Sequence, residues 1–284
     1  MAMMVTPLTP DFCAEITGID ITLPLDEAEF TAIRAAFDRW SVLIFPEQPL
    51  DDASQIAFSE NFGPLEPTRS VNPAAGTPFA RQSNLDIETG AVIPADDRRM
   101  AYHKANMLWH SDSTFKAVLS LCSVLSAREV PPVGGATQFA STRAAYEGLD
   151  EPVRARLKAA VVEHDFSHSR ALVGFEFTAQ EAAPFPAVRH RLVRVNANSG
   201  RKSVLIGAHA KLIVGWKAEE SRDMLDDLLA RAQQHAYSHE WRQGDVVIWD
   251  NQAALHRATP YDSVRHRRLM QRTTISSRNE ADAP

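Results

Sequence analysis

Apolar residues recur along this chain at both helical and strand-like spacings. Between residues 27 and 40, Phe30, Ile33 and Phe37 return every three or four positions, which predicts an amphipathic helix. Asp26 is placed to cap the start of that helix. The other predicted elements are a strand at 41–45, a helix from 51 or 52 to about 62 that Gly63 stops, strands at 119–130 and 136–140, two helices between 143 and 162, a hairpin of 192–195 with 203–206, a helix at 218–232, and strands at 239–249 and 268–276.

The second half of the chain has more predicted strands than helices, and the two do not alternate regularly. This pattern predicts a mixed α+β fold, mainly β, with an antiparallel double-sheet barrel and helices packed outside it. We expect one domain over residues 1–284. Residues 67–105 mix Pro, Gly, Asn and Asp without a period, which predicts a long active-site loop or lid. Residues 277–284 are polar and predict a frayed tail.

Composition excludes several classes of partner. The apolar content of 44% and charged content of 23% are ordinary for a soluble enzyme. A formal net charge of −6 leaves no basic surface for nucleic acid or anionic membranes, and no apolar run is long enough for a membrane span. The N-terminus lacks the pattern of a signal peptide, and Cys13 and Cys122 have no metal or redox spacing. We therefore expect a cytoplasmic protein.

The strongest chemical signal is a triplet, His110-Ser111-Asp112, with a distant third histidine. On an extended strand the side chains of His110 and Asp112 project to one side and can reach one metal ion. Two histidines and one carboxylate are the ligands that hold non-haem Fe(II) by one face, leaving positions open for a co-substrate and oxygen. One His-x-Asp triplet arises easily by chance among ten histidines. His256, which follows the apolar segment 244–251, is the predicted third ligand and raises the weight of the triplet.

Two arginines in a largely apolar strand point to an anionic ligand. Arg268 and Arg272 are four positions apart, so they share a face of the strand, whereas Arg265 and Arg267 fit a solvated surface. A buried guanidinium is costly unless an anion meets it, and a dicarboxylate co-substrate would do so. Thr137 follows a Gly-Gly turn and is a weaker candidate for the same carboxylate site.

At this point several segments resemble a known family, the taurine dioxygenase/TfdA family of Fe(II)- and α-ketoglutarate-dependent dioxygenases, and within it the 2,4-dichlorophenoxyacetate dioxygenase branch. The resemblance runs from about residue 5 to residue 276. The segments that carry the family likeness are Trp109–Ser113, Val133–Thr137, Ile206–Ala210, Gly244–Asn251, His256–Arg257 and Arg268 with Arg272, and those that carry the branch likeness are Ser41–Phe45, Gln55–Phe58, Phe62–Glu66 and Arg143–Tyr146.

The resemblance implies roles for individual residues and a distorted double-stranded β-helix, or jelly roll. His110, Asp112 and His256 would ligate Fe(II), and Arg268 with Thr137 would hold the distal carboxylate of α-ketoglutarate. Arg272 would lie near the carboxylates of both α-ketoglutarate and the substrate. The spacing after His256 leaves Arg267 as a competitor of Arg268. The residues considered for substrate contact are Arg272, Arg69, Ser70, Asn84 and His209. Arg69 stands near the place where the phenoxyacetate enzymes carry a lysine.

The implied reaction consumes O2 and α-ketoglutarate and hydroxylates a small carboxylate-bearing substrate, such as an aryloxyalkanoate. Hydroxylation beside the ether oxygen would release a phenol and an oxoacid, together with succinate and CO2. The alternatives are a taurine, alkyl-sulfonate or alkyl-sulfate dioxygenase, a non-catalytic metal-dependent binding module, and a jelly-roll metal enzyme that does not use α-ketoglutarate. A homo-oligomer is expected from the resemblance alone.

Overall fold

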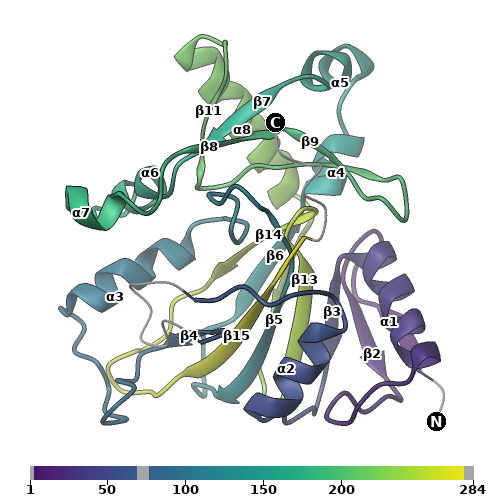
Figure 1. Cartoon of the computed structure of the whole chain (residues 1–284), viewed down its shortest axis with the longest axis vertical. Coiled ribbons are helices and arrows are strands. Elements are labelled where there is room, and N and C mark those ends of the chain that lie inside the picture. Colours follow the sequence, from purple (N-terminus) through teal and green to yellow (C-terminus); the bar gives the residue numbers. More distant parts are fainter. Residues whose placement is uncertain (1–2, 69–76, 278–284) are drawn as a thin grey trace.

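The computed structural model describes residues 3–68 and 77–277, and a seven-stranded sheet is its largest layer (Figure 1). The strand order is β1-β2-β3-β13-β5-β15-β4, and all neighbours are antiparallel except β2 and β3. These strands are β1 Met4–Pro7, β2 Ala14–Thr17, β3 Val42–Phe45, β4 Phe79–Ser83, β5 Ser120–Glu129, β13 Val246–Asp250 and β15 Leu269–Ser276.

Three smaller sheets complete the strands of the described residues. The order β12-β6-β14 makes the sheet that carries His256, β11-β7-β8 makes a second, and β9 pairs with β10 as the predicted hairpin. Their bounds are β6 Thr137–Ser141, β7 Val161–His164, β8 Val188–Arg191, β9 Val193–Val195, β10 Lys202–Val204, β11 Ala210–Ile213, β12 Ala236–His239 and β14 Ala254–Ala258.

The helices lie in separate groups around the sheets. In Figure 1, α1 and α2 lie beside the large sheet, α4, α5 and α8 gather at the opposite end of the molecule with β7–β11, and α3 lies near β4. Their bounds are α1 Glu27–Trp40, α2 Asp52–Glu60, α3 Arg98–His103, the 3₁₀ helix η1 Lys104–Met107, α4 Thr142–Glu147, α5 Glu151–Leu157, α6 Phe166–Ala171, α7 Ala179–Ala182 and α8 Ala218–Gln233. None of the helices in the described part of the chain combines the length and the apolar character that a membrane span requires.

Local signals fix the ends of the helices that the sequence predicts. At the start of α1 the Asp26 carboxylate accepts the Glu29 backbone N–H, and the Glu29 side chain accepts the Asp26 N–H, which forms a capping box. Ser41 ends the helix in the left-handed conformation at φ 63°. Asp51 caps α2 in the same way, and α2 ends at Glu60, slightly before the predicted stop at Gly63.

The core has two layers because β13 is buried on both faces. Val246 and Ile248 belong to the apolar cluster under α1 and α2, whereas Val247 and Trp249 belong to a cluster that includes Phe139 of β6. Alternate residues of a strand project to opposite faces, which explains why neighbouring residues of β13 belong to different clusters. The large sheet therefore packs one face on helices and the other against the β12-β6-β14 sheet. The mixed fold with helices outside is confirmed, while its description as a jelly roll stays a prediction.

Two predicted segments differ from the structure. The strand expected at 239–249 is two strands in different sheets, because the chain turns at Gly244, whose φ is +90°. The segment 67–105, expected as a partly ordered loop, contains β4 as an edge strand beside β15, and then α3 and η1. Phe79–Ser83 has no alternation of apolar and polar residues, so only its pairing with β15 reveals it as a strand.

Candidate metal centre and adjoining pockets

A reciprocal pair of backbone hydrogen bonds brings the two distant histidines together. The N–H of His110 donates to the His256 carbonyl at 3.1 Å, and the N–H of His256 donates to the His110 carbonyl at 2.9 Å. Directly opposed residues of an antiparallel pair hold their side chains on the same face. The two rings lie accordingly with centroids 4.2 Å apart.

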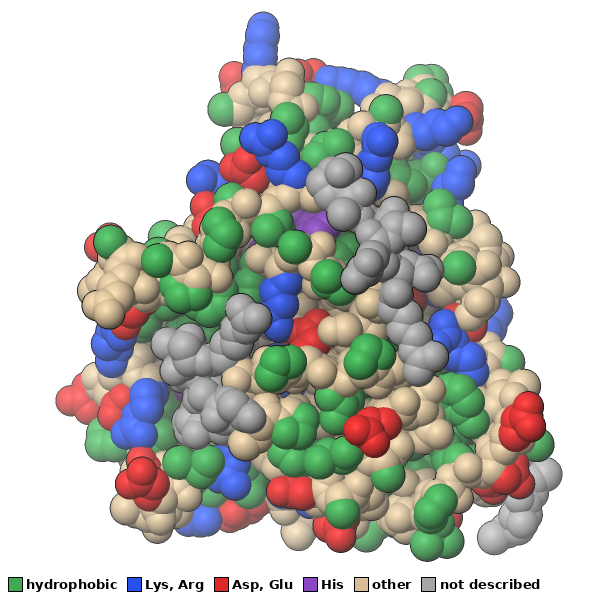
Figure 2. All heavy atoms as spheres, in the orientation of Figure 1, with side chains coloured by type: hydrophobic (Ala, Val, Ile, Leu, Met, Phe, Trp, Pro, Cys, Tyr) green, Lys and Arg blue, Asp and Glu red, His purple; other side chains and the backbone are tan. Residues whose placement is uncertain are grey.

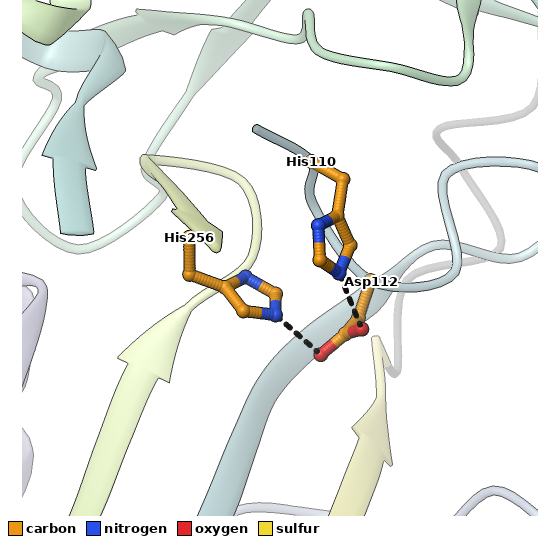
Figure 3. A group of neighbouring side chains, drawn as sticks. All are labelled: His110, Asp112 and His256. Carbon is orange, nitrogen blue, oxygen red and sulfur yellow. Dashed lines mark ion pairs between the residues drawn. The ribbon is translucent and has the colours of Figure 1, made fainter. Parts of the chain in front are cut away.

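Asp112 completes the group from the chain just after His110. Figure 3 shows the side chains of His110, Asp112 and His256 pointing toward one another. The Asp112 carboxylate lies 4.0 Å from Nε2 of His110 and 3.7 Å from Nε2 of His256. Two atoms each bonded at about 2.1 Å to one ion are at most about 4.2 Å apart, so both distances suit a shared ion. One ligand atom from each residue falls within 4.8 Å of the others.

Hydrogen bonds orient the Asp112 carboxylate. Ser123 on β5 donates its hydroxyl to Oδ2 of Asp112 at 2.7 Å, and the Asn251 amide donates to that serine at 2.9 Å. The Asn251 side-chain oxygen in turn accepts the Asp112 backbone N–H and the Trp249 indole N–H. Ser111 donates to the Asn251 carbonyl. The extended strand expected over 110–112 is absent, because His110 forms an isolated bridge and Asp112 begins a turn.

Burial and charge keep these donors in the forms that bind a metal. Burial lowers the pKa of His110 and of His256, which favours neutral imidazoles with a free lone pair. His110 accordingly has its Nδ1 at 2.7 Å from the Leu108 carbonyl, to which it donates, leaving Nε2 for the ion. Burial raises the pKa of Asp112, but the neighbouring charge of Arg272 and the Ser123 hydrogen bond lower it, and that pKa lies below its usual range. The donor set therefore fits a divalent transition metal.

A cavity of about 300 Å³ lies on one side of the metal group and contains the predicted co-substrate residues. Arg268, Thr137 and Arg272 all line it, together with His110 and His256. The Thr137 hydroxyl accepts the Trp241 indole N–H at 2.9 Å, so its own proton is directed elsewhere and can be donated to a carboxylate.

Arg268 and Arg267 face opposite ways. Arg268 is buried, donates to the backbone carbonyls of Gln82 and Gly135, and has an Nε with no partner among the described residues. Burial lowers its pKa to about 10. Arg267, whose side chain is 48% exposed, is paired with Glu129. The geometry places Arg268, rather than Arg267, where an anion in the cavity would meet it.

A second cavity, of about 110 Å³, adjoins the first on the Asp112 side of the metal group. It shares His110, Arg272, His103, Gln82 and Asn106 with the larger cavity. The amide of Asn106 donates to the side-chain oxygen of Gln82 at 2.7 Å, so two of the shared residues are joined by a hydrogen bond. His103 comes from α3, inside the segment 67–105 predicted as a lid, and Asn106 comes from η1, just beyond that segment.

The remaining predicted substrate residues have different fates. His209 lines the second cavity and is buried, with its ring 6.2 Å from that of His110. Asn84 is fully buried, and its side-chain amide forms hydrogen bonds with the backbone of Ser263, His266 and Arg268. It therefore fixes the loop before β15 rather than facing a cavity. Arg69 and Ser70 lie outside the described residues.

Several residues that shape the site have no recognisable pattern in the sequence. Ser123, Trp241 and Arg170 each lie in segments where hydroxyl, indole and guanidinium groups have ordinary surface or core roles. Trp249 and Asn251 belong to the segment Gly244–Asn251 that carries the family likeness. Their hydrogen bonds around Asp112, however, depend on the turn after β13. Pairing between β13 and β5 sets Trp249 opposite Ser123 and so brings Ser123 close to Asn251 and Asp112.

Two histidines and one carboxylate, gathered beside a cavity whose buried Arg268 has no carboxylate partner among the described residues, define the class of non-haem iron enzymes with a facial metal site. Comparison with known proteins agrees with this class. Residues 4–274 match the family model described as taurine catabolism dioxygenase TauD, TfdA family.

Individual relatives are similar over nearly the whole chain. The chain is 39% identical to the α-ketoglutarate-dependent 2,4-dichlorophenoxyacetate dioxygenase of Cupriavidus pinatubonensis, over 97% of this chain and 98% of that one. It is 37% identical to the (S)-phenoxypropionate/α-ketoglutarate dioxygenase of Sphingobium herbicidovorans, over 94% and 92%. The crystal structure of AAD-2 with Mn(II) and N-oxalylglycine superposes with a TM-score of 0.90 at 35% identity, covering 98% of both chains. The chain belongs to the TauD/TfdA family, and it is a non-haem iron dioxygenase that depends on Fe(II) and α-ketoglutarate.

Replacing Ser123 by Ala is expected to weaken Fe(II) binding about 10–100-fold, because Asp112 loses the hydrogen bond that orients it. The measurement is anaerobic titration of the metal. Ser126→Ala is the matched control, since that hydroxyl on the same strand bonds Gln55 instead. Equal metal affinity in the Ser123 variant and the wild type would contradict the orienting role.

Gly207→Ala is expected to destabilise the fold by roughly 1–3 kcal/mol and to weaken metal binding. At its φ of +109°, an added Cβ would lie 3.0 Å from the Trp109 carbonyl oxygen and 3.1 Å from the His110 Cα. Gly215→Ala is the control, because its φ is also positive but a Cβ there meets nothing within 4 Å. Thermal unfolding and metal titration of both variants test this, and equal metal affinities would show that His110 is not displaced.

Proposed function

We propose that this enzyme hydroxylates an aryloxyalkanoate, a small acid of the 2,4-dichlorophenoxyacetate type, and so cleaves its ether bond. The observation that carries the proposal is the pair of adjoining cavities, one with Arg268 and Thr137 and one lined by aromatic rings, that meet at His110. Identities of 37–39% to enzymes named for phenoxy acids support this substrate class.

Each part of the site has a task in this proposal. His110, Asp112 and His256 hold Fe(II), which when bound with α-ketoglutarate and O2 supplies the oxidising chemistry. Arg268 and the Thr137 hydroxyl bind the distal carboxylate of α-ketoglutarate and fix its orientation. Arg272 donates to Oδ1 of Asp112 at 2.5 Å and fixes that carboxylate between the two cavities. A hydroxyl added to the carbon beside the ether oxygen gives a hemiacetal, which collapses to a phenol and an oxoacid.

The finer structural predictions fit the same proposal. The face-to-face packing of the two sheets supports a distorted double-stranded β-helix, and the contribution of β13 to two apolar clusters supports one domain. α3 and η1, which line both cavities, support a lid role for part of 67–105. A lid matters here because excluding water keeps the oxidising chemistry on the substrate.

A panel of acids tests the substrate class. With Fe(II), α-ketoglutarate and O2, phenoxyacetate and its 4-chloro derivative are expected to stimulate succinate formation and to release the matching phenol in equal amount. Taurine and hexyl sulfate form the comparison arms. Turnover with taurine or hexyl sulfate but not with the phenoxy acids would assign the enzyme to the sulfonate or sulfate-ester dioxygenases. Absence of succinate formation with every compound would favour a non-catalytic binding module.

Two neighbouring arginines provide a matched pair for the co-substrate site. Arg268→Gln is expected to raise the KM for α-ketoglutarate by about 100-fold, since a buried charge-assisted contact with the carboxylate is lost. Arg267→Gln is expected to leave that KM within about twofold, because an exposed ion pair contributes little. The reverse order of effects would assign the carboxylate to Arg267.

A further inference from the structure

The second cavity contains a buried arginine that the metal and co-substrate sites do not use. Arg170, on α6, is 7% exposed and lines this cavity together with Asp112 and His209. Its Nε has no hydrogen-bond partner, and no carboxylate pairs with it within residues 3–68 and 77–277. A buried guanidinium without an anion is costly, so this side chain points to a ligand that brings the negative charge.

The other cations of the cavity already have partners. Arg272 is bound to Asp112, the predicted metal ligand. Lys116 is bound to Glu66, which also accepts the Ser113 hydroxyl. Arg170 is therefore the cation of this cavity that remains available to an incoming anion among the described residues.

Aromatic rings surround the Arg170 guanidinium on its apolar sides. Its centre lies 4.6 Å from the ring centroid of Phe166 and 4.5 Å from that of Tyr102. Phe166 in turn lies 4.2 Å from Phe115 and 4.9 Å from Phe185, both of which line the cavity. Stacking holds the guanidinium plane in place but leaves its N–H edges without acceptors, and those edges suit a carboxylate.

Arg170 also lies close to the reacting end of the cavity. The Phe166 ring lies 4.6 Å from the Arg170 guanidinium and 5.7 Å from the His209 ring. The His209 ring in turn lies 6.2 Å from the ring of His110. An anion at Arg170 would thus sit near the metal group, with its apolar part against Phe115 and Phe166.

We propose that Arg170 is the specificity-determining anchor of the primary substrate, binding its carboxylate while the ring cluster of Phe115, Phe166 and Phe185 holds its aryl group. This inference rests on the proposed function for the identity of the acid. It adds Arg170 of α6 to the residues that the sequence suggested for substrate contact, which include Arg272 and His209.

The test is a cycle of two variants and two ligands, read as binding rather than turnover. 4-Chlorophenoxyacetate and the uncharged 2-(4-chlorophenoxy)ethanol are titrated calorimetrically into anaerobic protein loaded with Fe(II) and α-ketoglutarate. Arg170→Gln is expected to weaken binding of the acid by about 100-fold and of the alcohol by less than about threefold. Arg170→Lys should recover part of the affinity for the acid, because the charge returns without the planar fork.

Arg98→Gln is the matched control. Arg98 also stacks on an aromatic ring, with its guanidinium 4.6 Å from the Phe175 ring centroid. It is exposed and paired with Glu181, so its loss should leave the affinities for the acid and the alcohol within about twofold. Affinity for α-ketoglutarate and the melting temperature, measured on every variant, report whether the fold and the co-substrate site are intact.

Each outcome decides the inference. Unchanged affinity for the acid in Arg170→Gln, or equal loss for acid and alcohol, overturns it, as does a wild type that binds none of the anions offered. If wild-type protein binds hexyl sulfate or taurine instead of the aryloxy acid, and Arg170→Gln weakens that binding, the anchor stands while the proposed substrate class fails.

Discussion

The site depends on one pair of main-chain hydrogen bonds, between His110 and His256. These residues lie far apart in the sequence, and a two-residue bridge sets them opposite each other with their rings on one face. The bridge sits where the β12-β6-β14 sheet meets the chain that leads into β5, so the packing of two sheets fixes the spacing of the metal ligands. Side-chain rotamers have only to complete a geometry that the backbone already supplies.

Buried charge is arranged around this bridge so that each cation has a distinct task. Arg272 neutralises Asp112, Lys116 neutralises Glu66, and Arg268 and Arg170 stay without a carboxylate in the described chain. Because an isolated buried cation is unfavourable, the two unpaired guanidinium groups are best explained by anions that arrive from solution. On the proposed function, one cavity would receive the co-substrate, and the other would receive the molecule to be oxidised.

Sequence patterns predicted the long, regular elements and the metal ligands, and they failed where the evidence is three-dimensional. The periodicity of α1 and the triplet at His110 are local, so they are legible in the chain itself. β4 carries no alternating pattern and becomes a strand only through its pairing with β15. Asn84 looked available for substrate because its three hydrogen bonds are to a loop about 180 residues away. The sequence could not predict a ligand-binding role for Arg170 for the same reason, because only the packing shows that its guanidinium lacks an acceptor among the described residues.

The metal ligands and the proposed substrate anchor come from different parts of the fold, which has a consequence for how substrate preference could change. The metal ligands come from β14 and the chain before β5, and Arg268 lies just before β15, whereas Phe166 and Arg170 belong to the short helix α6. If Arg170 anchors the substrate as proposed, substitutions in α6 would change which acid is bound while the metal ligands stay in place.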